Sequence, residues 1–329
     1  MTAIAAILPW QLEQWQSCQQ AITLQRVPQA LLIKGAAGLG KLHFAQQLAA
    51  ALLCEQRTAQ AFACGHCHSC TLFQAETHPD FICIEPEEPG KVIGIEAIRS
   101  LLLKLALKPQ YPQYRVVLFP SAELLNTASA NAFLKCLEEP SERTVIIMVT
   151  ALPERLPATI RSRCQQLHML KPEAENALAW LQQHATAQPR LLLAMARGAP
   201  LLALDYAKHD LIAVRAQCFE EWWQVATHKQ NPTLVAERWQ KLGAQDLLDW
   251  LASWVADLIK CYYTQDLKLF YNSDLVARLQ ELRKRLSLQK LFAYYTLLLA
   301  AKKNCHTTLN KQLQFEAILI DWSELNGTD

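Results

Sequence analysis

The sequence has no excess of either charge. Its 329 residues hold 32 Lys and Arg against 30 Asp and Glu, a formal net charge of +2. A protein that binds nucleic acid through a large part of its surface is strongly basic. The near balance excludes such a global basic field, so any contact with nucleic acid must come from a local patch or from partner chains.

Long hydrophobic runs are also missing. Apolar stretches such as Leu297–Ala301 fall far short of the roughly 20 residues that a membrane-spanning helix needs. Residues 1–15 have no basic residue ahead of their short apolar segment, and Pro9 and Glu13 follow at once, which matches a secretory signal poorly. Neither an internal repeat nor a low-complexity segment is visible. We therefore expect a cytoplasmic protein with no membrane partner.

The first half of the chain alternates two periodicities. Apolar residues recur at helical spacing over 95–105 and over 130–137, between short apolar or β-rich runs. Those runs are Ala30–Lys34, Phe81–Glu85, Arg115–Pro120, Thr144–Thr150 and Cys164–Met169. Because several of them are apolar throughout, they predict a parallel sheet of five strands covered by helices on both faces, an α/β domain.

A purely helical pattern begins near Leu170, so we expect an α/β region followed by an all-α one. Short helices are predicted at Glu173–His184, Arg190–Ala196 and Leu201–Lys208, and longer ones from about Asp210 onward. The chain length also favours two or three domains. The predicted division is an α/β domain over 1–169, a small helical domain over 170–208 and a larger helical domain over 209–329.

Most of the tryptophans lie in the last of these regions. Their neighbours are leucines and alanines with few Arg or Lys between them, so we interpret them as helix-packing residues rather than a base-stacking surface. They are Trp222, Trp223, Trp239, Trp250, Trp254 and Trp322.

A phosphate-binding loop is predicted at residues 35–41, Gly-Ala-Ala-Gly-Leu-Gly-Lys, between a strand and a helix. Glycines let the backbone turn its N–H groups toward a phosphate, and the lysine reaches the β and γ oxygens. The candidate phosphate-binding residues are therefore Gly35, Gly38, Gly40 and Lys41.

Both positions that normally hold Mg²⁺ in such a loop are altered. Position 42 is Leu where the motif has Ser or Thr, and Leu offers no oxygen. Pro120 and Ser121 stand at the end of the third strand where an Asp is expected, and Glu123 lies beyond it. Two readings remain open at this point: a pocket that binds ATP or ADP without hydrolysing it, or a tight turn with no ligand.

Four clustered cysteines, Cys54, Cys64, Cys67 and Cys70, have the spacing C-x9-C-x2-C-x2-C. Such spacing is typical of tetrahedral zinc, and four thiolates leave no position open for water. The first cysteine is expected at the end of the helix that starts at the phosphate loop, and the other three in a tight loop. We therefore predict a structural zinc site over 54–70, with His66 and His68 as bystanders.

These features, together with further motifs, resemble the delta-prime subunits of bacterial DNA polymerase III, members of the AAA+ clamp-loader family. The matching segments include Thr77–Asp80, the LEEP-type run Ala130–Pro140 and the SRC element Ser162-Arg163-Cys164. The resemblance implies an AAA+ domain, a helical lid and a helical collar that joins five subunits in a ring. It also implies gamma/tau and delta subunits as partners, with the β sliding clamp and primer-template DNA contacted through the assembly.

The resemblance further implies a role for Arg163. In this family the SRC arginine acts as a finger toward the nucleotide of a neighbouring subunit, and a permanently charged guanidinium suits that task. Arg163 is thus the expected finger in trans, with Ser162 and Cys164 shaping its turn. The alternative is a surface arginine that pairs with a nearby carboxylate.

Two other classes of protein are weighed against this interpretation. An ATP-hydrolysing subunit of the gamma/tau type shares the cysteine cluster and SRC element but should carry Ser or Thr at position 42 and an acid after the third strand. A DNA-binding zinc ribbon should carry a basic module, whereas Cys54–Cys70 holds one Arg and no Lys.

Overall fold

The computed structural model describes residues 7–88, 90–184, 187–304 and 310–327. The chain divides into two compact units, Met1–Glu173 and Ala174–Asp329. Residues 1–6, which carry part of the signal-sequence argument, lie outside the described residues. No helix in the described ranges is both long and apolar enough to cross a bilayer.

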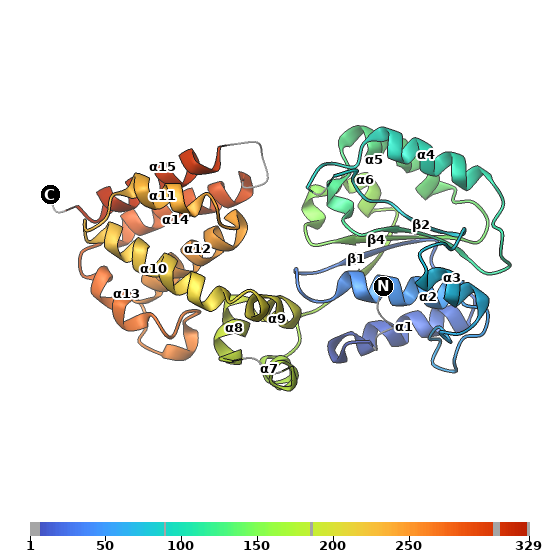
Figure 1. Ribbon diagram of the computed structural model, residues 1–329, viewed down its shortest axis with the longest axis horizontal. Coiled ribbons are helices and arrows are strands. Elements are labelled where there is room, and N and C mark those ends of the chain that lie inside the picture. Colours follow the sequence, from blue (N-terminus) through green and yellow to red (C-terminus); the bar gives the residue numbers. More distant parts are fainter. Residues whose placement is uncertain (1–6, 89, 185–186, 305–309, 328–329) are drawn as a thin grey trace. The chain divides into compact units, whose positions relative to one another are not determined.

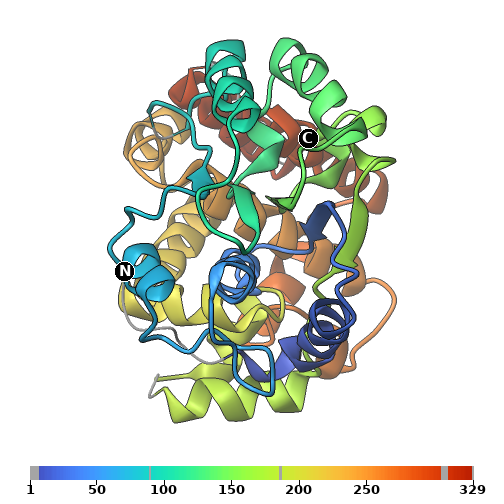
Figure 2. The ribbon, with the colours of Figure 1, turned by 90° about the vertical axis from the view of Figure 1, so that its right-hand side faces the viewer.

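The first unit is built on a parallel sheet of five strands in the order β2-β3-β4-β1-β5. Helices α4, α5 and α6 cover one face, and α1, α2 and α3 lie on the other (Figure 1); Figure 2 shows the same two helical layers from the side. The strands are β1 (Ala30–Lys34), β2 (Phe81–Cys83), β3 (Arg115–Phe119), β4 (Thr144–Thr150) and β5 (Gln165–His168). The helices are α1 (Leu12–Thr23), α2 (Lys41–Leu53), α3 (His68–Gln74), α4 (Ile95–Ala106), α5 (Thr127–Glu138) and α6 (Ala158–Arg161).

The apolar runs of the sequence explain this sheet. Every residue of β3 and β4 is buried, and successive side chains of a strand point to opposite faces. Leu32, Val117 and Ile146 share a core with α4 and α5, which leaves their neighbours along each strand for the face that α2 covers. The prediction of five parallel strands is confirmed; β2 and β3 end earlier than expected, and β5 begins at Gln165 rather than Cys164.

The second unit contains only helices in the part of the chain that the structure describes. They are α7 (Ala174–Gln183), α8 (Pro189–Met195), α9 (Pro200–Lys208), α10 (Leu211–Ala226), α11 (Pro232–Trp239), α12 (Ala244–Lys260), α13 (Val276–Arg283), α14 (Leu288–Asn304) and α15 (Lys311–Leu325).

This unit has two hydrophobic cores. One lies within α7, α8 and α9, and the other within α10 to α15. Met195 and Leu211 pack against both cores, and the Tyr206 hydroxyl donates a hydrogen bond of 2.6 Å to Asp246. The separate cores are compatible with a lid and a collar, but the division at residue 208 stays a prediction.

The six tryptophans from residue 222 onward pack in or against the core of α10 to α15, as predicted. Trp222 and Trp322 stack with ring centroids 4.0 Å apart, and the Trp322 indole N–H donates to the Trp222 carbonyl at 3.0 Å. Trp223 is half-buried beneath the Arg278 guanidinium, whereas the other five are buried. None of the six is free to stack on a base.

Candidate functional site

The phosphate loop connects β1 to α2 and depends on its glycines. A Cβ atom on Gly35 would lie 2.5 Å from the Met169 carbonyl oxygen, which follows β5, so no larger residue fits there. Gly38 and Gly40 have φ values of 74° and 77°, in the left-handed region that glycine adopts without strain. Gly40 also caps the N-terminus of α2, where backbone N–H groups attract an anion.

Two N-terminal side chains hold this loop from outside. The buried Gln11 amide donates to the carbonyl oxygens of Leu39 at 2.8 Å and Gly40 at 3.0 Å. The Trp10 indole N–H donates to the same Leu39 carbonyl at 3.0 Å. Sequence reasoning missed this role of Gln11.

Lys41 is turned toward its own loop. Its buried ammonium donates a 2.6 Å hydrogen bond to the Ala36 carbonyl oxygen. Burial lowers the pKa of Lys41 to about 8, and the negative charge of Glu123 acts in the opposite direction. One Glu123 carboxylate oxygen accepts a 3.4 Å hydrogen bond from the Ala151 N–H, and the other is buried with no hydrogen-bond partner among the described residues.

The two altered metal positions lie where the sequence analysis expected them. Leu42 is in the first turn of α2 with a partly exposed side chain. Pro120 and Ser121 directly follow β3, and Glu123 lies one turn later, in the short 3₁₀ helix Ala122–Leu124. At these positions only Ser121 and Glu123 carry side-chain oxygens.

The four cysteines of the module converge on one point. All four sulfurs lie within 4.8 Å of one another, and two Sγ–Sγ pairs, Cys54–Cys67 and Cys64–Cys70, are 3.9 Å apart. An ion bound to four sulfurs at the usual zinc distance of about 2.3 Å would separate them by about 3.8 Å. The cluster could hold a metal ion, and its geometry is consistent with zinc.

Hydrogen bonds within the module favour thiolates. Backbone N–H groups of Cys64, Cys67 and Cys70 donate to the sulfurs of Cys54, Cys64 and Cys67 at 3.3, 3.3 and 3.4 Å. Although burial acts in the opposite direction, hydrogen-bond donors lower the pKa of Cys64 to about 6. Burial raises the pKa of Cys54 and Cys70, so without a metal ion the donors outweigh burial at Cys64 but not at these two cysteines.

One expectation about the module is wrong in detail. Cys70 lies in the first turn of α3 and not in a loop, because Cys67 caps that helix by accepting from the Cys70 N–H. His66 and His68 are exposed and stand outside the cluster. Arg57 donates to the carbonyl oxygens of Ala51 and Leu52 at the end of α2, so the module's one arginine is already engaged.

A buried hydrogen-bond chain ties the module to the sheet. The His78 Nδ1 accepts from the Asp80 N–H at 3.1 Å, so its Nε2 carries the proton and donates to the Ser69 hydroxyl at 2.7 Å. Ser69 donates in turn to the Leu53 carbonyl at 2.7 Å. The Asp80 carboxylate accepts from Arg115 of β3. The His-Pro-Asp motif of residues 78–80 therefore has a structural role here.

The SRC element follows α6. Ser162 caps this helix, and its hydroxyl donates to the Thr159 carbonyl at 3.2 Å. Cys164 is buried beside Met148, and burial raises the pKa of its thiol to about 11, which suits a packing role. Arg163 forms an ion pair with Glu138, which matches the alternative of a surface arginine paired with a nearby carboxylate; the sequence did not indicate that Glu138 is the partner.

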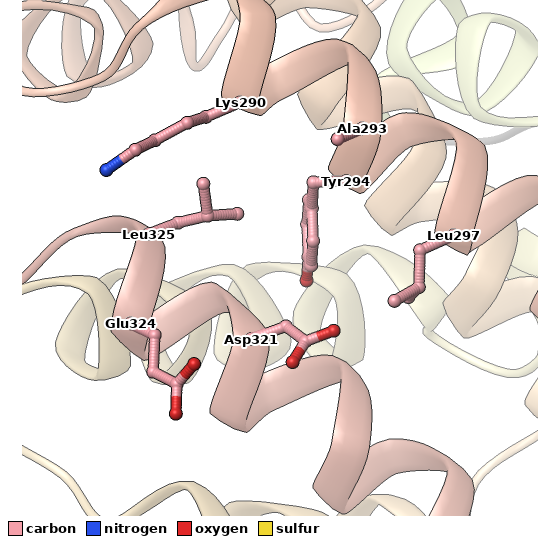
Figure 3. A pocket seen from close by; sticks show the side chains of 7 residues that line it. All are labelled: Lys290, Ala293, Tyr294, Leu297, Asp321, Glu324 and Leu325. Atoms are coloured by element: carbon pink, nitrogen blue, oxygen red, sulfur yellow. The ribbon is translucent and has the colours of Figure 1, made fainter.

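The second unit has a hollow between α14 and α15. Its volume is about 370 Å³, and Figure 3 shows Lys290 at one end of it and Glu324 and Asp321 on the opposite helix. The Tyr294 hydroxyl at its floor donates to the Ile318 carbonyl at 3.1 Å. The same helices expose four large apolar side chains, Phe292, Leu299, Leu313 and Ile320.

The fold and these sites define a parallel α/β domain with a phosphate loop and a four-cysteine module, followed by a helical region. A family model described as "DNA polymerase III, delta subunit" matches residues 10–173, and one described as "DNA polymerase III, delta subunit, C terminal" matches residues 209–324.

Individual relatives agree with the family models. The DNA polymerase III subunit delta' of Pseudomonas aeruginosa is 34% identical over 330 residues, covering 98% of this chain and 99% of that protein. The subunit delta' of Escherichia coli is 33% identical over 259 residues, 78% of this chain and 77% of that protein. The E. coli subunit tau is 34% identical over 183 residues, 54% of this chain and 28% of that protein. The chain belongs to the delta-prime family of DNA polymerase III subunits.

Proposed function

We propose that this chain is a clamp-loader subunit that does not hydrolyse ATP. It assembles with gamma/tau and delta subunits into a five-membered ring, which opens the β sliding clamp and places it on primed DNA. One observation carries the non-hydrolysing part: the phosphate loop keeps its backbone form, while Leu42 offers no oxygen and Pro120 and Ser121 stand where an Asp is expected after β3.

The contacts of Lys41 support this assignment. Phosphoryl transfer relies on a metal ion and a lysine to neutralise charge on the transferred group. Leu42 supplies no oxygen for the metal, and the Lys41 ammonium is bonded to the Ala36 carbonyl of its own loop. The loop's N–H groups remain available for ATP or ADP, so nucleotide binding without hydrolysis is compatible with the geometry. We expect the isolated chain to show no Mg²⁺-dependent ATP turnover.

Arg163 gives the subunit a catalytic role in trans. It lies close to the molecular surface, and a chain without hydrolysis of its own does not need an arginine directed at its own phosphate loop. A planar guanidinium binds phosphate oxygens with two hydrogen bonds and stabilises the charge that develops during transfer. We assign Arg163 as the finger toward the γ-phosphate of the neighbouring ATPase subunit.

Arg163→Ala in the reconstituted loader should lower turnover at the neighbouring site by roughly 10³-fold or more, since arginine fingers contribute about that much. Clamp-stimulated ATPase and clamp loading are the measurements, with assembly checked by gel filtration. Arg155→Ala, at an exposed arginine in the preceding turn, is the matched control. If a fully assembled Arg163→Ala loader hydrolyses ATP and loads clamps at the wild-type rates, Arg163 is not an arginine finger.

We also assign the metal of the cysteine module as one structural zinc ion bound by Cys54, Cys64, Cys67 and Cys70. A closed shell of four thiolates excludes a catalytic water. Binding of structural zinc contributes roughly 10–16 kcal/mol in small domains, enough to fix the module in place.

Purified protein should therefore contain one zinc per chain, and Cys67→Ser should lose it and lower the unfolding midpoint. Cys18→Ser, at a half-buried cysteine outside the cluster, should keep both. Metal analysis and thermal unfolding provide the two readouts. A metal-free wild-type protein, or equal zinc content in Cys67→Ser, contradicts the assignment.

Assembly is assigned to residues from about 210 onward, and we assign the contact surface to α14 and α15. Phe292 and Leu299 are seven residues apart on α14, as are Leu313 and Ile320 on α15, so each pair shares one face of its helix. Contiguous exposed apolar side chains commonly mark protein interfaces.

The double substitution Leu299→Glu and Leu313→Glu should leave the fold intact, because both side chains are exposed, yet weaken joining to the loader at least tenfold. Co-elution with the other subunits measures this. Leu267→Glu, at a similarly exposed position outside both helices, is the control and should join normally.

A shortened chain that ends at Lys208 tests the assembly region as a whole. It should stay soluble but fail to join the loader. Normal assembly of this shortened chain would show that the collar assignment is wrong.

A further inference from the structure

Arg163 is held in this structure by an acidic residue of another motif. Its Nε donates to the Glu138 Oε1 at 2.8 Å, and its Nη2 donates to the same oxygen. The Nη1 donates to the Thr159 carbonyl oxygen at 3.0 Å. Each of the three guanidinium nitrogens thus has a partner within this chain.

The contact links two segments that are distant in sequence. Glu138 is the last residue of α5, and Arg163 follows α6, which packs against α5 in the same core. The carboxylate compensates the charge of the guanidinium, and the three contacts use three of its five N–H groups. A phosphate therefore competes with Glu138 for the charge and for the Nε and Nη2 donors that a bidentate contact needs.

The pair is exposed enough to open. The Arg163 and Glu138 side chains are 35% and 48% exposed, and ion pairs of such exposure shift an equilibrium by no more than roughly fivefold. A γ-phosphate carries a greater negative charge and can therefore replace the carboxylate. The ion pair orients the arginine but is weak enough to be exchanged for a phosphate contact.

We propose that Glu138 is a positioning residue that holds Arg163 away from the neighbour's nucleotide until the ring closes. The arginine then exchanges the Glu138 carboxylate for the γ-phosphate. No covalent step is involved. The inference rests on the proposed function, because it requires Arg163 to act as the finger.

The neighbouring residue offers a matched control. Glu139 is exposed in the same motif, and its carboxylate makes no hydrogen bond or ion pair with the described part of the chain. Glu138→Gln removes the charge that holds Arg163 and preserves side-chain shape, and Glu139→Gln makes the same change where no arginine is held.

The experiment is steady-state ATPase of the reconstituted loader without clamp or DNA, comparing wild type, Glu138→Gln, Glu139→Gln, Arg163→Ala and the double variant Glu138→Gln/Arg163→Ala. Freeing the arginine should raise the basal kcat two- to fivefold in Glu138→Gln, while Glu139→Gln stays at the wild-type value. In the Arg163→Ala background, Glu138→Gln should have no further effect, because Glu138 acts through that arginine.

The outcomes separate this inference from the function beneath it. If Arg163→Ala lowers turnover while Glu138→Gln leaves kcat unchanged or lowers it, Glu138 does not hold the arginine back, although the finger stands. If Glu138→Gln changes kcat equally with and without Arg163, its role is structural and the inference is wrong. If Arg163→Ala has no effect in an assembled ring, the proposed function itself is wrong.

Discussion

Parallel pairing of β1 with β4 and β5 is the constraint on which the rest of this site depends. In a parallel sheet all strands end at the same edge, and ligands of open α/β sheets bind beyond that edge. The loop after β1 therefore meets the segment after β5, where Met169 leaves room only for Gly35. It also faces the segments after β3 and β4, from which Glu123 and Ala151 come.

This shared edge explains how the loop keeps its backbone form although the positions that normally hold Mg²⁺ are altered. The backbone conformation is fixed by glycines, by Gln11 and by the sheet, none of which depends on a metal ion. Side chains that hold the metal can then be lost without unfolding the loop. The loop still carries its lysine, Lys41, whose ammonium donates a hydrogen bond to the Ala36 carbonyl oxygen. The negative charge of Glu123 is close enough to raise the pKa of Lys41.

Much of this could be predicted from the sequence because the signals are local. Apolar runs predict the strands, and cysteine spacing predicts the cluster. Contacts between distant residues could not be predicted in the same way. The Glu138–Arg163 pair joins two recognised motifs, but nothing in either motif indicates which of its neighbours the arginine binds. The position of Cys70 on α3 was missed because a short helix capped by a cysteine has no clear periodicity.

The central claim is that this chain contributes to hydrolysis in trans and not at its own phosphate loop. The most direct measurement is the clamp- and DNA-stimulated ATPase of a reconstituted loader in which only this chain carries Lys41→Ala. The account predicts a turnover equal to that of the wild-type loader, because no hydrolysis takes place at this loop. A substantial loss of turnover in a fully assembled ring would contradict the account and indicate an ATP-hydrolysing subunit of the gamma/tau type.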